Sequence, residues 1–233
     1  MAEHTVKAYD EELTALAGRI AEMGGLAETT VSNSVTALVT QDLDLARATI
    51  EQDARLDELF QEIEMGIVEI IARRQPMGRD LREIVAAGRI SNDLERTGDL
   101  AKNVAKRVIA IDSDLTSKKL AIGVEHMTEL TLSQLKKVLD AYTQRDAPAA
   151  ADVRERDREV DAIYTSLFRE LLTYMMEDPR SISQCAHLLF CAKNIERIGD
   201  HATNIAESVY YMVTGERLGD ERQKIDETGV VVK

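Results

Sequence analysis

Glu196 and Asp200 are two carboxylates four residues apart in the stretch NIERIGDHATNIAE, residues 194–207, whose composition favours a helix. This spacing places both side chains on one helix face, one turn apart. Like charges at that spacing cost about 0.2–0.5 kcal/mol, and Gly199 between them costs roughly 1 kcal/mol relative to alanine. A bound cation would offset these costs, so the pair is a candidate for metal coordination.

The pattern acid-x-x-x-acid occurs four times, at matched positions of an internal repeat. Residues 92–108 match residues 193–209, and the segment before each of them is repeated as well. The four pairs are Asp53 with Asp57, Glu95 with Asp99, Asp157 with Asp161, and Glu196 with Asp200. A single acidic pair is usually a feature of a solvated helix face. Four pairs at matched positions favour a shared role.

Two proline turns place these pairs opposite one another. Pro76 separates the two acid-bearing segments of the first half, and Pro179 separates those of the second half. Asp57 lies 19 residues before Pro76, and Glu95 lies 19 residues after it. Residues equidistant from the turn of an antiparallel helical hairpin lie at the same height. The sequence therefore predicts two clusters of four carboxylates, one in each half.

Clusters of carboxylates without thiolates suit hard or borderline ions such as Mg²⁺, Mn²⁺, Ca²⁺, iron or Zn²⁺. Asn103 and Asn204, each one turn beyond the second acid of its helix, are candidates to supply a carbonyl oxygen or to contact the ligands. We interpret Gly98 and Gly199 as making room for the neighbouring helix or for the ion.

The helical phase predicts that the acidic clusters are exposed. Glu95 and Asp99 point away from the apolar stripe formed by Leu94, Ala101 and Val104. A cluster at the surface would hold metal loosely and would be within reach of partner proteins.

Histidine and cysteine contribute little to these clusters. His201 lies about 100° around the helix from Asp200, which favours a polar interfacial histidine over a metal ligand. Cys185 and Cys191 are six residues apart on one predicted helix, roughly 9 Å along its axis, so they cannot form a disulfide with each other. Their repeat counterparts are isoleucines, which predicts two small core residues.

The elements that position these residues are helices. Hydrophobic residues make up 44% of the 233 residues, with only three prolines and no tryptophan, and apolar positions recur with helical periodicity. We predict an all-α fold of two tandem, similar three-helix bundles, spanning residues 5–111 and 112–213, with a polar C-terminal tail at 214–233. The predicted helices are 5–40, 42–74, 78–111, 116–144, 148–177 and 180–213.

Composition excludes several classes of function. A net charge of −13 repels phosphate backbones and anionic membranes, so we expect neither nucleic-acid binding nor membrane insertion. No basic and apolar leader and no membrane helix are present, which predicts a cytoplasmic protein. The Glu-x-x-His motif of ferritin-like diiron oxidoreductases is absent, as are phosphate-binding loops and hydrolase triads, so we do not expect an enzyme. A helical adaptor that binds no metal remains an alternative.

The duplicated sequences LERTGDLAKN and IERIGDHATNIAE, each within a three-helix repeat, resemble the PhoU family over residues 5–213. This family comprises accessory and regulatory proteins of bacterial phosphate-specific transport. The resemblance implies a negative regulator of phosphate uptake and of the phosphate-starvation response, which contacts the transporter ATPase and a sensor histidine kinase. It also implies iron or zinc clusters held by the eight acids named above. Whether the chain forms a homodimer, and whether it serves another pathway as an adaptor, remain open.

Overall fold

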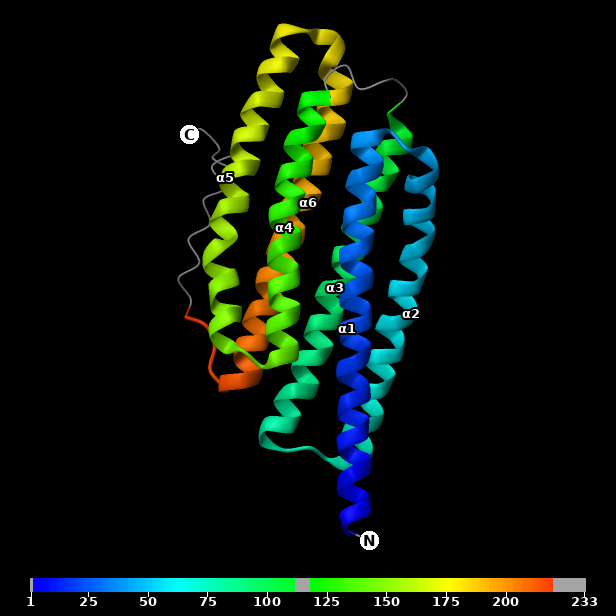
Figure 1. Ribbon diagram of the computed structural model, residues 1–233, viewed down its shortest axis with the longest axis vertical. Coiled ribbons are helices and arrows are strands. Elements are labelled where there is room, and N and C mark those ends of the chain that lie inside the picture. The colour runs from blue at the N-terminus through cyan, green and yellow to red at the C-terminus, as the bar shows by residue number, and fades with distance from the viewer. Residues whose placement is uncertain (1, 112–117, 220–233) are drawn as a thin grey trace.

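The protein is a bundle of long helices, shown in Figure 1 by a computed structural model that describes residues 2–111 and 118–219. The described part contains no strand. Its elements are α1 (Ala2–Thr40), α2 (Leu43–Arg74), α3 (Gly78–Ala110), α4 (Lys118–Gln144), α5 (Ala147–Glu177), the short 3-10 turn η1 (Pro179–Ser181) and α6 (Ile182–Thr214). The all-α prediction is confirmed. The predicted start of the fourth helix and most of the predicted tail lie outside the described residues.

The turns follow from local chemistry. Asp42 accepts hydrogen bonds from the backbone of the first turn of α2, and Asp146 does the same for α5, as is typical of N-cap residues. Gln75 ends α2 in the left-handed conformation, with φ of 49°, directly before Pro76. Pro179 begins η1 between α5 and α6. Both predicted proline turns are therefore confirmed.

The two halves pack side by side. α1 and α3 of the first half contact α4 and α6 of the second, whereas α2 and α5 lie on the outer flanks (Figure 1). Arg89 stacks on Tyr211, and Arg107 stacks on Phe190, so α3 and α6 run antiparallel along their contact. We call the line where α3 meets α6 the seam.

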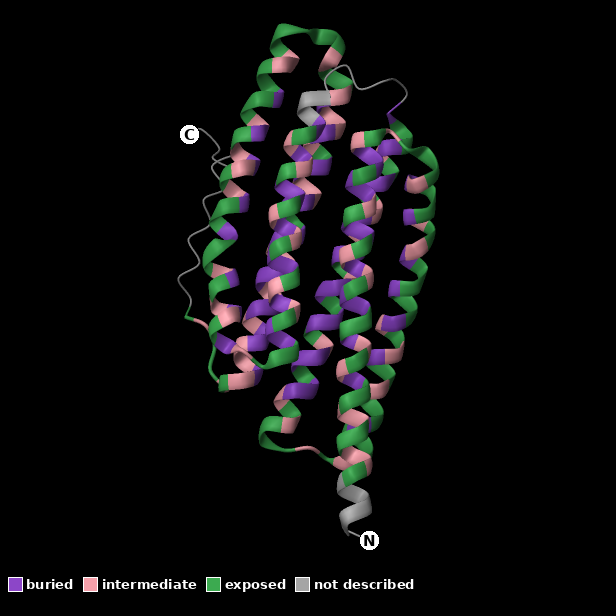
Figure 2. Cartoon of the chain, viewed as in Figure 1, coloured by how far each residue is buried: buried purple, intermediate pink, exposed green. Residues whose placement is uncertain are grey.

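The hydrophobic core extends across both halves. One cluster combines Val35 and Val104 with Ile195, and a second combines Ile20 and Leu94 with Ile205. The buried residues face the interior along the central part of the bundle, whereas the turn between α5 and α6 is exposed or half-buried (Figure 2). Each cluster draws on both repeats, so the repeats stabilise one another.

Cys185 and Cys191 are buried free thiols within this core, which confirms their predicted role as small core residues. Among the described residues, no helix is long and apolar enough to cross a membrane.

Candidate metal centres

The first acidic cluster lies between α2 and α3, and it already contains a cation. Lys102 of α3 donates a hydrogen bond to the carboxylate of Asp53 on α2. Its Nζ also lies 3.7 Å from Asp99 Oδ1. Arg96 adds a second positive charge, with Nε 3.3 Å from Glu95 Oε2 and a guanidinium nitrogen 3.6 Å from Asp99 Oδ2. This site is therefore a network of ion pairs.

The four acids of the first cluster are close enough to influence one another. Partial desolvation raises the pKa of Asp57 above its ordinary value, the negative charges of Asp53 and Asp99 raise it further, and Lys102 opposes the rise. Burial also raises the pKa of Glu95, where Arg96 opposes the rise and the other three acids add to it. The predicted meeting of the two pairs across the hairpin is confirmed for the first half.

The second cluster, between α5 and α6, centres on Glu196. Lys193 Nζ lies 3.0 Å from Glu196 Oε1. The other oxygen, Oε2, is buried and accepts no hydrogen bond from any described residue. Burial raises the pKa of Glu196, Lys193 lowers it, and the nearby charges of Asp200 and Asp161 raise it. The acidic pairs of α5 and α6 therefore lie close together, as those of α2 and α3 do.

The prediction that the clusters are exposed is wrong for three of the eight acids. Only 3% of Asp53, 8% of Asp157 and 5% of Glu196 is exposed. Asp57 is exposed, and the remaining four acids are half-buried. The helical wheel considered each helix alone, whereas the antiparallel packing of α2 on α3 and of α5 on α6 covers the acids that face the partner helix.

The two glycines differ. A methyl group at Gly98 would overlap Cδ1 of Leu56, whose side chain is fully buried. A methyl group at Gly199 would lie 3.6 Å from Val160 Cγ1, which is an ordinary contact. The interpretation that glycine makes room for the neighbouring helix is confirmed at Gly98 and is wrong at Gly199. That either glycine makes room for an ion stays a prediction.

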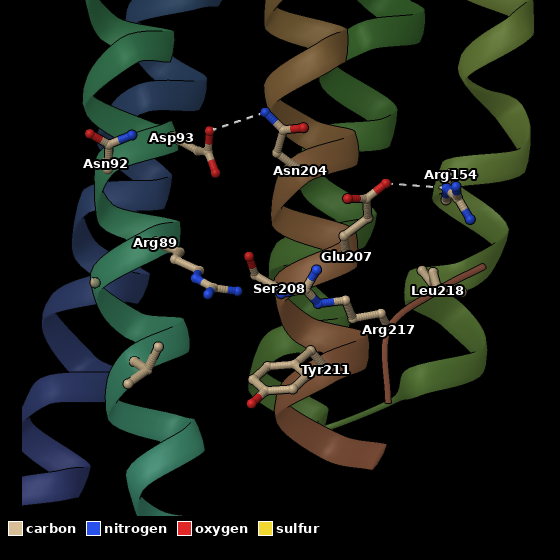
Figure 3. Close-up of a pocket in the computed structure, with 12 residues that line it drawn as sticks. Arg89, Asn92, Asp93, Arg154, Asn204, Glu207, Ser208, Tyr211, Arg217 and Leu218 are labelled. Carbon is tan, nitrogen blue, oxygen red and sulfur yellow. Dashed lines mark hydrogen bonds and ion pairs between the residues drawn. The ribbon is translucent and has the colours of Figure 1, made fainter. Parts of the chain in front are cut away.

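His201 lies at the interface between the halves, as predicted. Its Nδ1 is 2.8 Å from Asp93 Oδ1, across the seam. Asn204 Nδ2 donates to the same Asp93 oxygen over 3.4 Å. Figure 3 shows both Asp93 and Asn204 at the wall of a cavity of about 800 Å³ on the seam. Asn103, the repeat counterpart of Asn204, lines a different groove. The predicted contacts of both asparagines with metal ligands stay predictions.

Whether the acids fit a metal ion depends on the cluster. Within residues 7–111 and 121–219, no three histidine, cysteine, aspartate or glutamate side chains are arranged to hold one ion. In the first cluster the Lys102 ammonium lies where a metal would neutralise Asp53 and Asp99. In the second cluster the unused oxygen of Glu196 is an acceptor that a cation would satisfy. Thr203 stands at the position that corresponds to Lys102. The unused Glu196 oxygen therefore favours a cation in the second cluster, where Lys193 pairs with the other oxygen of the same carboxylate.

Sequence reasoning missed three charged residues of these sites. Lys102 lies three residues after Asp99 within LAKN, and Lys193 lies three residues before Glu196. A search for basic partners at three-residue spacing finds both. Asp93 carries no such signal, because its partners come from the other half of the chain.

Fold and sites together define a class: a helical-bundle protein built from two related halves, each with a carboxylate cluster between its last two helices. The family model described as PhoU domain matches this chain twice, at residues 20–108 and 124–209. The chain belongs to the PhoU domain family.

Relatives of known name and structure agree with this membership. A phosphate-specific transport system accessory protein PhoU homolog from Rhizobium meliloti is 59% identical over 228 residues, covering 98% of this chain and 96% of that protein. A protein of the same name from Caulobacter vibrioides is 51% identical, covering 97% and 98%. The crystal structure of PhoU from Pseudomonas aeruginosa has a TM-score of 0.85 at 38% identity, covering 89% of this chain and all of that one.

Proposed function

We propose that this chain restrains phosphate uptake and the phosphate-starvation response, as an accessory protein of phosphate-specific transport in the cytoplasm. The observation that carries this proposal is the 59% identity to an accessory protein of that transport system, over nearly the whole of both chains. The names of these relatives describe accessory proteins. Regulation by binding is thus favoured over catalysis.

The proposed partners are the ATPase of the phosphate transporter and a sensor histidine kinase. A chain with a net charge of −13 attracts basic patches on other proteins, and such association is weakened by salt. Two similar halves offer two related surfaces, which suits a protein that links one partner to another. A second copy of the chain is a further candidate partner.

Metal ions are proposed to contribute to these surfaces. Glu196, Asp200, Asp157 and Asp161 would hold an ion in the second cluster, where the buried Glu196 oxygen supports its presence. Iron, zinc, Mg²⁺ and Mn²⁺ all accept carboxylate oxygens. The ion would offset the repulsion between these carboxylates. It would thereby hold them in one arrangement at the surface that partners contact.

Co-purification from phosphate-replete cells tests the proposal. The tagged chain should retain the transporter ATPase and the sensor kinase, and both should dissociate as the salt concentration rises. The same chain expressed in cells without the transporter serves as the control. Retention of unrelated proteins in place of both partners would favour an adaptor of another pathway.

A further inference from the structure

A groove of about 560 Å³ lies on the seam near the C-terminal end of α3, and the described residues that line it are basic, amide or aromatic. Its four cations are Lys106 and Arg107 of α3 and Lys193 and Arg197 of α6. Among the described residues, no acidic side chain lines it, although the chain carries 42 aspartates and glutamates against 29 lysines and arginines. We call it the basic groove.

The basic groove and the cavity of Figure 3 are repeat counterparts with different charges. At the repeat offset, Lys106 corresponds to Glu207, Arg107 to Ser208, Asn194 to Asp93 and Phe190 to Arg89. Each of the two acids of the cavity has a partner: Arg154 Nε lies 3.2 Å from Glu207 Oε1, and His201 pairs with Asp93. In the basic groove a lysine and an asparagine stand at those two acidic positions. Its positive charge is therefore a difference between the halves rather than a property of the fold.

Most of this positive charge has no internal partner. Lys193 pairs with Glu196, but Lys106, Arg107 and Arg197 form no ion pair with any described residue. The guanidinium of Arg107 lies 4.5 Å from the centre of the Phe190 ring, and 53% of Phe190 is exposed. Converging cations repel one another, so an anion in the groove would stabilise this arrangement.

We propose that the basic groove binds a chain of phosphoryl groups, as found in inorganic polyphosphate or in a nucleoside triphosphate. Arginine and lysine bind phosphoryl oxygens through charge-assisted hydrogen bonds, and several adjacent cations suit several linked anionic groups. A concave groove of this volume matches a small ligand, whereas a protein partner needs a wider contact of about 800 Å². The exposed Phe190 ring offers a stacking surface for a base.

Calorimetric titration of the intact protein with tripolyphosphate tests this proposal directly, in buffer free of divalent ions. Tripolyphosphate should bind at a single site and more tightly than orthophosphate, sulfate or hexaglutamate. The double variant Lys106→Glu, Arg107→Ser introduces the repeat counterparts of both residues, and it should weaken binding by about tenfold or more. Phe190→Ala separates the two sources of phosphoryl groups, since it should weaken ATP more than tripolyphosphate if a base stacks there.

Matched controls make the result decisive. Arg47→Glu with Arg73→Ser makes the same change in net charge at exposed residues outside the groove, and it should leave the affinity for tripolyphosphate unchanged. Glu196→Gln with Asp200→Asn should also retain binding, which separates the groove from the metal proposal. If the groove variant does not fold, as judged by circular dichroism, Arg197→Gln takes its place and should weaken binding more than Arg73→Gln, which removes one charge outside the groove. Absence of tripolyphosphate binding at millimolar concentration, equal losses in the Arg47 and Arg73 control, or tighter binding of hexaglutamate would each overturn the proposal.

Discussion

Lys102 of α3 donates a hydrogen bond to the buried carboxylate of Asp53 on α2, and this ion pair joins the two helices at the first acidic cluster. The interaction with Asp53 raises the pKa of Lys102, which keeps the ammonium charged. The second half has Thr203 at the corresponding position. The two clusters, alike in their acids, therefore differ in the cation that neutralises them.

Replacing Lys102 by methionine should destabilise the metal-free protein by about 1–3 kcal/mol, because buried Asp53 loses its partner. The same change should increase metal uptake by the first cluster. Denaturant unfolding after chelation and elemental analysis before it measure the two effects. Lys106→Met is the matched control, since Lys106 forms no ion pair with the described residues, and its effect should stay within about 0.5 kcal/mol. A Lys102 variant as stable as the control would contradict this account of the first cluster.

The double variant Glu196→Gln, Asp200→Asn should remove at least half of the bound metal. The matched change in the first half, Glu95→Gln with Asp99→Asn, should remove less, because Lys102 already neutralises that cluster. The measurement is the metal-to-protein ratio of protein purified without chelator. Both variants should keep their helical circular dichroism, since each relieves repulsion between like charges. An unchanged ratio in the second-half variant would argue against a metal site there.

Alanine at the two glycines should have opposite effects. Gly98→Ala forces the fully buried Leu56 to move, and we expect a loss of about 1–3 kcal/mol. Gly199→Ala meets only ordinary contacts, and we expect a gain of about 0.5–1 kcal/mol from the helical preference of alanine. Thermal unfolding of both variants, without metal, gives the comparison. Equal shifts for the two variants would mean that the close contact with Leu56 does not decide the outcome.

The two thiols should be unreactive in the folded protein at pH 8. Burial raises the pKa of the Cys191 thiol to about 12, so the reactive thiolate is scarce. Because this folded pKa lies above the unfolded value of about 8.5, the stabilising contribution is complete below pH 8.5 and is lost as the pH rises toward 12. A colorimetric thiol reagent should detect both cysteines only after denaturant is added. Fast reaction of either one in native buffer would contradict its burial.

Much of the fold follows from periodicity and the repeat. The apolar stripes and the two prolines locate the helices, because long amphipathic helices and their breaks leave clear local signals. How the halves pack leaves no such signal. Ile195 and Val104 share a hydrophobic cluster although they lie in different repeats, and their separate helical patterns would be the same in two independent bundles.

For the candidate sites, the sequence predicts which acids come together but not how deeply they are buried. Symmetry about the turns predicts that the acids of each hairpin meet, and the charge coupling of Asp57 with Asp99 and of Glu196 with Asp161 confirms it. The burial of Asp53 depends on the neighbouring helix, which a single-helix wheel omits. The tight contact at Gly98 comes from Leu56, whose repeat counterpart Val160 is smaller and leaves an ordinary contact at Gly199. The helices that carry the two glycines do not show this difference, because it lies on the helix opposite.

The most direct test of the proposed function is a phosphate-starvation reporter in a strain that lacks this gene, grown with abundant phosphate. The account predicts that the reporter is expressed despite the phosphate, and that the intact gene silences it again. A copy carrying Glu196→Gln and Asp200→Asn should silence it only in part, if the second cluster contributes to the partner contact. A reporter that stays silent in the deletion strain would contradict the assignment of this protein as a restraint on the phosphate-starvation response.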